Sequence, residues 1–235
     1  MSVGNTNEVN RERWVQNVLS SIPAGSRILD AGAGEQKYKP FCAHLKYVSQ
    51  DFARYNGKGD GSGFQTGSWE QGKLDIVSDI AAIPEPDNSF DAVMCIEVLE
   101  HVPNPVSAIK EFSRLIRKGG CLILTAPFCS MTHFAPYHFF TGFSRYFYEK
   151  YLSGHGFTIV EMRPNGNFFE YLAQEIRRIP YVAERYTRGA WNIMTRIALV
   201  IIVRAMLVIL GLLSRRDKGS QDILCFGYHI LARKI

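Results

Sequence analysis

The sequence has few cysteines, and no two of them stand in a Cys-x-x-Cys spacing. The five are scattered and odd in number: Cys42, Cys95, Cys121, Cys129 and Cys225. This pattern argues against a disulfide framework and against a thiolate zinc site. Because three of them fall inside apolar runs, we expect buried, reduced thiols in a reducing compartment.

The N-terminus also lacks the apolar core of a signal peptide, since residues 1–13 are polar. We therefore expect a cytoplasmic protein. No strong excess of one charge covers the whole chain: the formal net charge is +5, with its positive excess concentrated between Arg177 and Lys218. Such a local bias favours a surface partner for one segment, and we expect no nucleic-acid partner.

What is present indicates one α/β domain spanning residues 1–235. Apolar runs separated by turn residues predict seven strands, at 27–31, 46–50, 74–78, 90–96, 121–126, 157–162 and 223–233. Helical spacing predicts helices near 10–20, 108–116 and 143–152. Strands that alternate with helices imply a mainly parallel sheet with helices on both faces. The glycine-rich residues 54–73 predict a mobile loop.

A tight glycine turn follows the first predicted strand, in Asp30-Ala31-Gly32-Ala33-Gly34. Ligands of open α/β sheets bind beyond the carboxyl ends of the strands, where this turn is expected. The next two strands end at Asp51 and Asp79. Acids at successive strand ends suit an uncharged, polyhydroxylated ligand and would repel a pyrophosphate. The third glycine of a dinucleotide fingerprint is also missing, because Lys37 stands there.

Four segments together resemble the class I S-adenosylmethionine-dependent methyltransferases, in their small-molecule, type 11-like branch. They are residues 28–34, 79–91, 97–102 and 114–120, within a match that covers about residues 24–163. The resemblance implies a Rossmann-like, seven-stranded sheet with an antiparallel last strand, and S-adenosyl-L-methionine as cofactor. Its one departure is Glu35-Gln36, where many members have another glycine.

The resemblance also implies a role for each matching position. The methionine part of the cofactor would lie on Asp30, Gly32 and Gly34, with Ala31 between them. Asp51 would hold the ribose, and Asp79 with Ile80 the adenine. Ile96 and Glu97 would line the sulfonium side.

Methyl transfer to a hydroxyl needs alignment and a proton acceptor. The candidates beyond the strand ends are His138, His133, Glu97 and His101, although each histidine could instead cap a helix or bond a carbonyl. Aromatic residues crowd positions 128–151, as pocket walls or as core. Cys129, His133 and His138 match no standard zinc spacing, so we expect no metal.

Residues 163–222 form an insertion between the last two predicted strands, which we expect to be helical. At 100° per residue, Arg185, Arg188, Asn192 and Arg196 share one helix face, with Trp191 among the apolar remainder. This predicts an amphipathic helix, within residues 185–216, on an anionic membrane surface. A protein interface, such as a homodimer, or a lid is the alternative. A single span is disfavoured because it would separate residues 223–233 from their sheet.

The sequence thus predicts a methyltransferase peripheral to the inner face of the membrane. Its expected acceptor is a small-molecule or lipid-linked one, and the leading hypothesis is O-methylation of a sugar or lipid-linked glycan. A quinone- or isoprenoid-pathway methyltransferase is the first alternative. A nicotinamide-dependent reductase and a non-catalytic nucleotide-binding protein are the others.

Overall fold

A computed structural model describes residues 3–188 and 192–235. The chain divides into two compact units. The larger contains Arg11–Arg163 and Gly227–Ile235, and the smaller contains Met1–Asn10 and Pro164–Phe226. The two units are described separately below.

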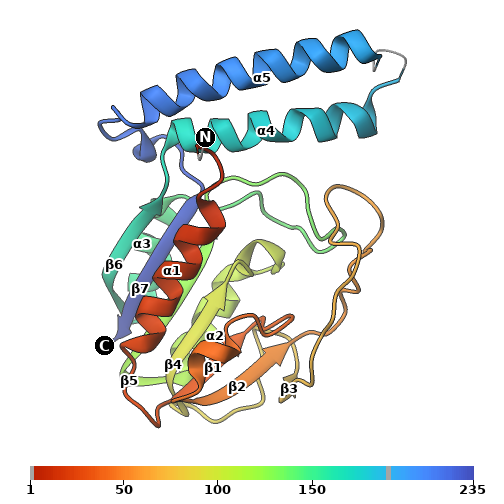
Figure 1. The fold of residues 1–235 in the computed structure, drawn as a ribbon. Coiled ribbons are helices and arrows are strands. Elements are labelled where there is room, and N and C mark those ends of the chain that lie inside the picture. The colour runs from red at the N-terminus through yellow and green to blue at the C-terminus, as the bar shows by residue number, and fades with distance from the viewer. Residues whose placement is uncertain (1–2, 189–191) are drawn as a thin grey trace. The chain divides into compact units, whose positions relative to one another are not determined.

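The larger unit is built on a seven-stranded sheet, shown in Figure 1, with strand order β3-β2-β1-β4-β5-β7-β6. The strands are β1 (Arg27–Ala31), β2 (Lys46–Asp51), β3 (Ile76–Val77), β4 (Phe90–Ile96), β5 (Ile116–Pro127), β6 (Phe157–Asn165) and β7 (Gly227–Lys234). The first five run parallel, and β7 pairs antiparallel with β5 from Cys121↔Arg233 to Pro127↔Gly227. The predicted Rossmann-like fold with an antiparallel last strand is therefore confirmed.

Helices cover both faces of this sheet (Figure 1). They are α1 (Asn7–Ser20) on one face, and α2 (Pro105–Leu115) and α3 (Arg145–Gly154) on the other. The apolar stripe of α1, which includes Trp14 and Leu19, packs on inward-facing strand residues such as Ile28 and Met94. Helix α2 begins where the sequence provides a cap, because the Asn104 side chain accepts a hydrogen bond from the Ser107 amide at 3.1 Å.

Two predicted strands are shorter than expected. The third strand is reduced to Ile76–Val77, because the Asp75 carboxylate binds both the amide and the hydroxyl of Ser49, each at 2.8 Å, where a strand would continue its ladder. The last strand begins at Gly227, after a 3₁₀ turn, η3 (Ser220–Asp222). After the glycine turn, the chain forms the short 3₁₀ helix η1 (Lys39–Cys42).

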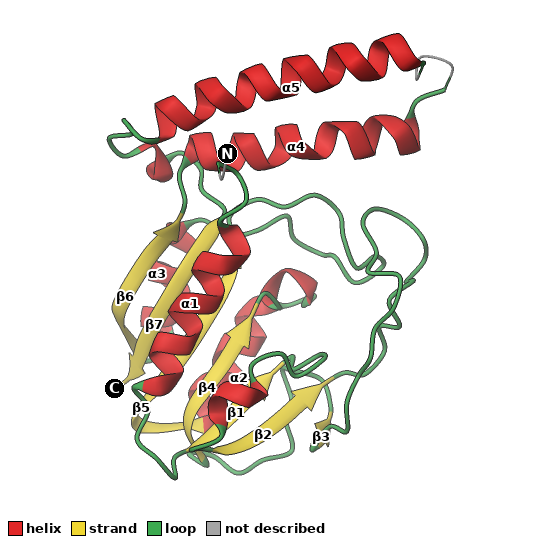
Figure 2. Cartoon of the chain, viewed as in Figure 1, coloured by secondary structure: helices red, strands yellow, loops and turns green. Residues whose placement is uncertain are grey.

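The smaller unit is a helical hairpin of α4 (Phe168–Tyr186) and α5 (Ile193–Ser214), seen as two long helices in Figure 2. Val203, Leu207 and Leu210 line the buried stripe of α5 and share a core with Ala173 and Ile176 of α4. This spacing of three to four residues keeps a single face of α5 against α4.

The predicted single basic face was wrong. Asn192 is the N-cap of α5, accepting a hydrogen bond from the Thr195 amide at 3.0 Å, so Arg185 and Arg196 stand on different helices. Trp191 lies outside the described residues. Helix α5 is long and apolar enough to cross a membrane, with a mean hydropathy of 2.7 over 18 residues of which 17% are buried.

Candidate active site

The glycine turn lies at the carboxyl end of β1 and is held by the end of β2. Gly32 and Gly34 have φ angles of +80° and +50°, which side-chain-bearing residues rarely adopt. The Gln50 carbonyl accepts from the amide of Gly32 at 2.9 Å, and the Asp51 carboxylate accepts from the amide of Gly34 at 3.0 Å. The turn is thereby fixed before any ligand binds.

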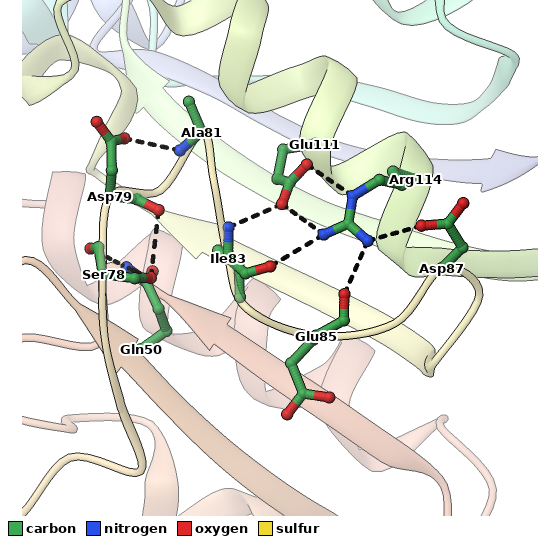
Figure 3. A network of polar contacts seen from close by, with 9 residues as sticks. All are labelled: Gln50, Ser78, Asp79, Ala81, Ile83, Glu85, Asp87, Glu111 and Arg114. Atoms are coloured by element: carbon green, nitrogen blue, oxygen red, sulfur yellow. Dashed lines mark hydrogen bonds and ion pairs between the residues drawn. The ribbon is translucent and has the colours of Figure 1, made fainter.

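Gln50 is a site residue that the sequence reasoning missed. Its side chain is 1% exposed, and its Nε2 donates to the Ser78 carbonyl at 2.7 Å (Figure 3), tying the end of β2 to the segment after β3. A buried amide must find partners, so a glutamine directly before the acid that ends the strand was the available signal.

Asp30 is buried beneath the turn rather than exposed at its surface. Its Oδ2 accepts from the Tyr47 hydroxyl at 2.6 Å. Burial raises the pKa of Asp30 to about 7; the Tyr47 hydrogen bond opposes this shift and the nearby Asp51 carboxylate adds to it. Ala31, the next residue, is fully buried.

The segment expected at the adenine lies at the tip of β3. Asp79 is exposed and its Oδ1 accepts from the Ala81 amide at 2.8 Å, whereas Ile80 is buried. Behind this segment, Arg114 of α2 donates to the carbonyls of Ile83 (3.0 Å) and Glu85 (2.7 Å), as Figure 3 shows. The same guanidinium pairs with Glu111 and Asp87. Arg114 therefore fixes the passage that leads from β3 to β4.

Ile96 is the last residue of β4 and Glu97 follows it, at the same edge of the sheet. Glu97 has a φ of +55°, its Oε1 accepts from the Thr125 hydroxyl at 2.8 Å, and its Oε2 pairs with Arg11 at 3.1 Å. Both carboxylate oxygens are thus engaged. Of the four candidate bases, Glu97 is the one held by an ion pair with a cation.

The structure brings the three candidate histidines together. The ring of His133 lies 4.7 Å from the rings of both His101 and His138, between centroids. His101 and His133 each place Nδ1 against a backbone carbonyl, of Tyr137 at 2.6 Å and of Met131 at 2.9 Å. His138 Nε2 lies 3.2 Å from the Ser130 hydroxyl. His101 and His133 therefore bond carbonyls, as the alternative interpretation held, and all three histidines also form one cluster.

Burial sets the protonation of this cluster. It lowers the pKa of His101 to about 3, with a further contribution from His133, and it lowers the pKa of His138 for the same two reasons. The imidazoles of His101 and His138 are therefore held neutral, and a neutral imidazole is the form that accepts a proton.

Glu100 belongs to this cluster, and the sequence reasoning did not single it out. Its side chain is 1% exposed, and burial, with Glu97 nearby, raises the pKa of Glu100 well above its usual range. Its Oε1 lies 3.7 Å from His101 Nε2 and 4.0 Å from His133 Nε2. The signal that the sequence offers for Glu100 is its position directly before the candidate base His101.

Aromatic rings stand beside the histidines. Phe134 lies 4.4 Å from Tyr55 and 5.3 Å from Trp69, between centroids. Tyr55 and Trp69 come from the glycine-rich segment, which has neither helix nor strand, as predicted. Backbone hydrogen bonds attach it to the loop after β5, including Phe64 amide to Thr132 carbonyl at 2.9 Å and Phe134 amide to Phe64 carbonyl at 3.0 Å.

The groups at the strand ends fit an uncharged nucleoside. The sequence analysis singled out one acid at the tip of each of β1, β2 and β3: Asp30, Asp51 and Asp79. Carboxylates accept hydrogen bonds from ribose hydroxyls and from amino groups. The same acids would repel a pyrophosphate, which argues against a dinucleotide.

Comparison with known proteins shows that the chain is similar to methyltransferases. A family model described as "Methyltransferase domain" matches residues 29–124. The chain is similar to a demethylmenaquinone methyltransferase of Renibacterium salmoninarum, 30% identical over 187 residues that cover 77% of this chain and 70% of the relative. It is also similar to a ubiquinone biosynthesis O-methyltransferase of Xanthomonas oryzae pv. oryzae, 36% identical over 105 residues that cover 43% of each chain. The chain thus spans less than half the length of that relative.

Solved structures share the fold. A SAM-dependent methyltransferase from Archaeoglobus fulgidus superposes with a TM-score of 0.56 at 16% identity, covering 97% of this chain and 94% of the other. A phosphoethanolamine N-methyltransferase of Haemonchus contortus, in complex with S-adenosyl-L-methionine, gives 0.53 at 15% identity, covering 96% and 52%.

Proposed function

Because this chain belongs to the class I S-adenosylmethionine-dependent methyltransferase family, we propose that it methylates a hydroxyl on a quinone-pathway aromatic ring. The observation that carries this proposal is the common edge of the sheet. Two features follow the carboxyl ends of adjacent strands at this edge. One is the glycine turn, which Gln50 and Asp51 hold, and the other is the cluster of three histidines.

The cofactor-binding residues in this proposal are those that the family resemblance implies. Gly32 and Gly34, with Ala31 and Asp30, hold the methionine part; Asp51 holds the ribose; Asp79 and Ile80 hold the adenine. Ile96 and Glu97 line the sulfonium side, with Arg11 and Thr125 keeping the Glu97 carboxylate in place. Bound S-adenosyl-L-methionine supplies an electrophilic methyl group, so the chain has only to align the acceptor and remove its proton.

His138 is the proton acceptor in this proposal. The ring nitrogens of His101 and His133 that face the cluster lie against the buried Glu100, and burial makes His101 a weak base. His138 is half-buried, and its pKa is lowered from the ordinary value, so it is neutral at physiological pH. Its contact with the Ser130 hydroxyl orients the ring.

The acceptor is assigned to the quinone pathway rather than to a glycan. Both curated relatives reported above are named for quinone biosynthesis, and neither is named for a sugar. Phe134 and Trp69 are partly exposed aromatic rings near the histidines, with the buried Tyr55 packed against both, and aromatic acceptors pack well against such rings. The glycan hypothesis from the sequence has less support than this alternative.

The helical hairpin fits a membrane surface, where a quinone precursor with a lipid tail would be found. One face of α5 is buried, and the remainder exposes large apolar side chains: Ile193, Met194, Ile197, Val200, Ile201, Ile202, Met206, Val208, Ile209, Leu212 and Leu213. Arg188, Arg215, Arg216 and Lys218 flank it, and basic flanks favour an anionic leaflet. We place the enzyme on the cytoplasmic side of the membrane, as a peripheral protein.

A direct assay tests the proposal. Full-length protein is incubated with methyl-labelled S-adenosyl-L-methionine and either a prenylated catechol or a lipid-linked sugar, and products are weighed by mass spectrometry. A gain of one methyl on the catechol alone supports the proposal. Methylation of the sugar alone would overturn the proposed acceptor class. Absence of S-adenosylhomocysteine binding in calorimetry would overturn the proposed methyltransferase activity itself.

A further inference from the structure

The cluster around Glu100 has the composition and spacing of a metal site. Glu100, His101 and His133 each offer one ligand atom, and these three atoms lie within 4.8 Å of one another. This is not the set that the sequence suggested and set aside, because Cys129 and His138 are replaced by Glu100 and His101. The structure brings it together from the segment after β4 and the loop after β5.

The imidazoles are oriented as metal ligands usually are. His101 and His133 both direct Nδ1 to a backbone carbonyl, which fixes the proton on Nδ1 and leaves Nε2 as the acceptor nitrogen. In each ring that Nε2 lies close to Glu100 Oε1, at 3.7 Å for His101 and 4.0 Å for His133. Two acceptor nitrogens and a carboxylate therefore converge, although none of the three offers a proton to the others at hydrogen-bonding distance.

Glu100 supplies an independent observation. Its Oε2 is buried and, within residues 3–188 and 192–235, meets no hydrogen-bond partner. A buried carboxylate oxygen without a partner is costly, and a cation beside the same carboxylate would remove that cost. The backbone around it is firmly placed, since the Glu100 carbonyl accepts from the amides of Phe139 and Phe140 at 2.9 and 3.1 Å.

We infer that Glu100, His101 and His133 bind a divalent transition-metal ion, with zinc as the best match. Two histidines and one glutamate are a ligand set of catalytic zinc sites, which keep a fourth position open. Ligands about 2.0–2.1 Å from a tetrahedral ion stand roughly 3.4 Å apart. The two glutamate–histidine separations, 3.7 and 4.0 Å, therefore need to shorten by about half an ångström on binding, and the two histidine nitrogens, within 4.8 Å of each other, also have to approach. Metal binding at this site does not depend on the proposed methyl transfer.

The test is metal binding by the full-length protein after chelation and dialysis. Zn²⁺ is titrated by calorimetry, and Co²⁺ is titrated by absorption spectroscopy, which separates nitrogen and oxygen ligands from sulfur. We expect one equivalent to bind, and we expect Glu100→Gln and His133→Ala each to weaken binding by about 100-fold or more, since even residues behind metal ligands are worth 10- to 100-fold.

Two variants are matched controls. His44→Ala removes an exposed histidine far along the chain, and Cys129→Ser removes the thiol nearest in sequence to His133; both should bind Zn²⁺ as the parent does. Circular dichroism checks the fold of each variant. The inference is overturned if the parent binds no Zn²⁺ or Co²⁺, if folded Glu100→Gln and His133→Ala retain parental affinity, or if Cys129→Ser abolishes binding.

Discussion

The carboxylate of Asp51 accepts a hydrogen bond from the backbone amide of Gly34, at 3.0 Å. Its other oxygen accepts from the amide of Ala53 at 2.8 Å. The acid at the end of one strand therefore fixes the glycine turn at the end of its neighbour. A residue that the sequence assigned only to ligand binding also has a structural task.

Replacing Asp51 tests both tasks. We expect Asp51→Ala to weaken S-adenosylhomocysteine binding by about 100-fold and to lower stability by about 1–3 kcal/mol, because the Gly34 amide loses its partner. Asp79→Ala, at an exposed position, should weaken binding without a change in stability. Calorimetry and urea unfolding measure the two effects. A double variant that binds as tightly as the parent would refute the cofactor site.

The glycine turn can be tested against a matched glycine elsewhere. Gly32 and Gly25 share a φ of +80°, but a Cβ on Gly32 would lie 2.6 Å from the Val98 methyls, whereas one on Gly25 meets nothing within 4 Å. Gly25→Ala should cost only the backbone strain of about 1–2 kcal/mol. Gly32→Ala should cost more and should also weaken S-adenosylhomocysteine binding. Equal unfolding free energies for the two variants would argue against the packing described.

Asp30 predicts a pH dependence of stability. Its folded pKa, about 7, lies above the ordinary 3.8, so the folded state retains the proton more tightly than the unfolded state. The stability from Asp30 is therefore complete below about pH 4 and is lost as the pH rises through 7, by about 4 kcal/mol in all. The free energy of unfolding of Asp30→Asn should then increase relative to that of the parent as the pH rises from 5 to 7. Above pH 7 the difference should stay constant.

Urea unfolding at each pH, for parent and Asp30→Asn, checks this, because the difference cancels other titrating groups. Tyr47→Phe is the second variant. The Tyr47 hydroxyl lowers the pKa of Asp30. In the Tyr47→Phe background, the pH above which Asp30→Asn gains no further stability should therefore be higher. A parent–variant difference that stays flat from pH 5 to 8 would contradict the shifted pKa.

Arg114 predicts a local stability effect. It donates to two backbone carbonyls and pairs with Glu111 in a half-buried setting, whereas its partner Asp87 is 68% exposed. Arg114→Ala should destabilise the protein by about 2–4 kcal/mol, because Glu111 loses its partner as well. Asp87→Ala should cost less than about 1 kcal/mol, as exposed ion pairs do. Thermal unfolding compares them, and equal losses would be the contrary result.

The exposed face of α5 predicts vesicle binding. Full-length protein should float with vesicles containing anionic lipid, and replacing Ile201 and Ile202 by glutamate should abolish flotation while S-adenosylhomocysteine binding persists. Val77, an exposed apolar residue of the larger unit, provides the control, since Val77→Glu should still float. Flotation that survives the α5 changes would exclude this surface.

Much of the fold was predictable because burial leaves a clear pattern in the sequence. The largely buried strand β4 appears as an apolar run interrupted only by Asp91, and α1 appears as apolar residues at helical spacing. Strand boundaries failed where a side chain took over a backbone partner, as Asp75 does at Ser49. The single basic face failed because the helix was assumed to be continuous through Asn192, which caps α5 instead.

The sequence by itself determined the succession of strands along the chain, the glycine turn and the acids at the strand ends, since these depend on local patterns of burial and backbone conformation. Only the tertiary structure decided that Gln50 holds the turn, that Arg114 fixes the passage after β3, and that Glu100 faces His101 and His133. The physical reason is that these groups interact across segments distant in the sequence. Their buried polar atoms need partners, and only the folded chain determines which partners lie within reach.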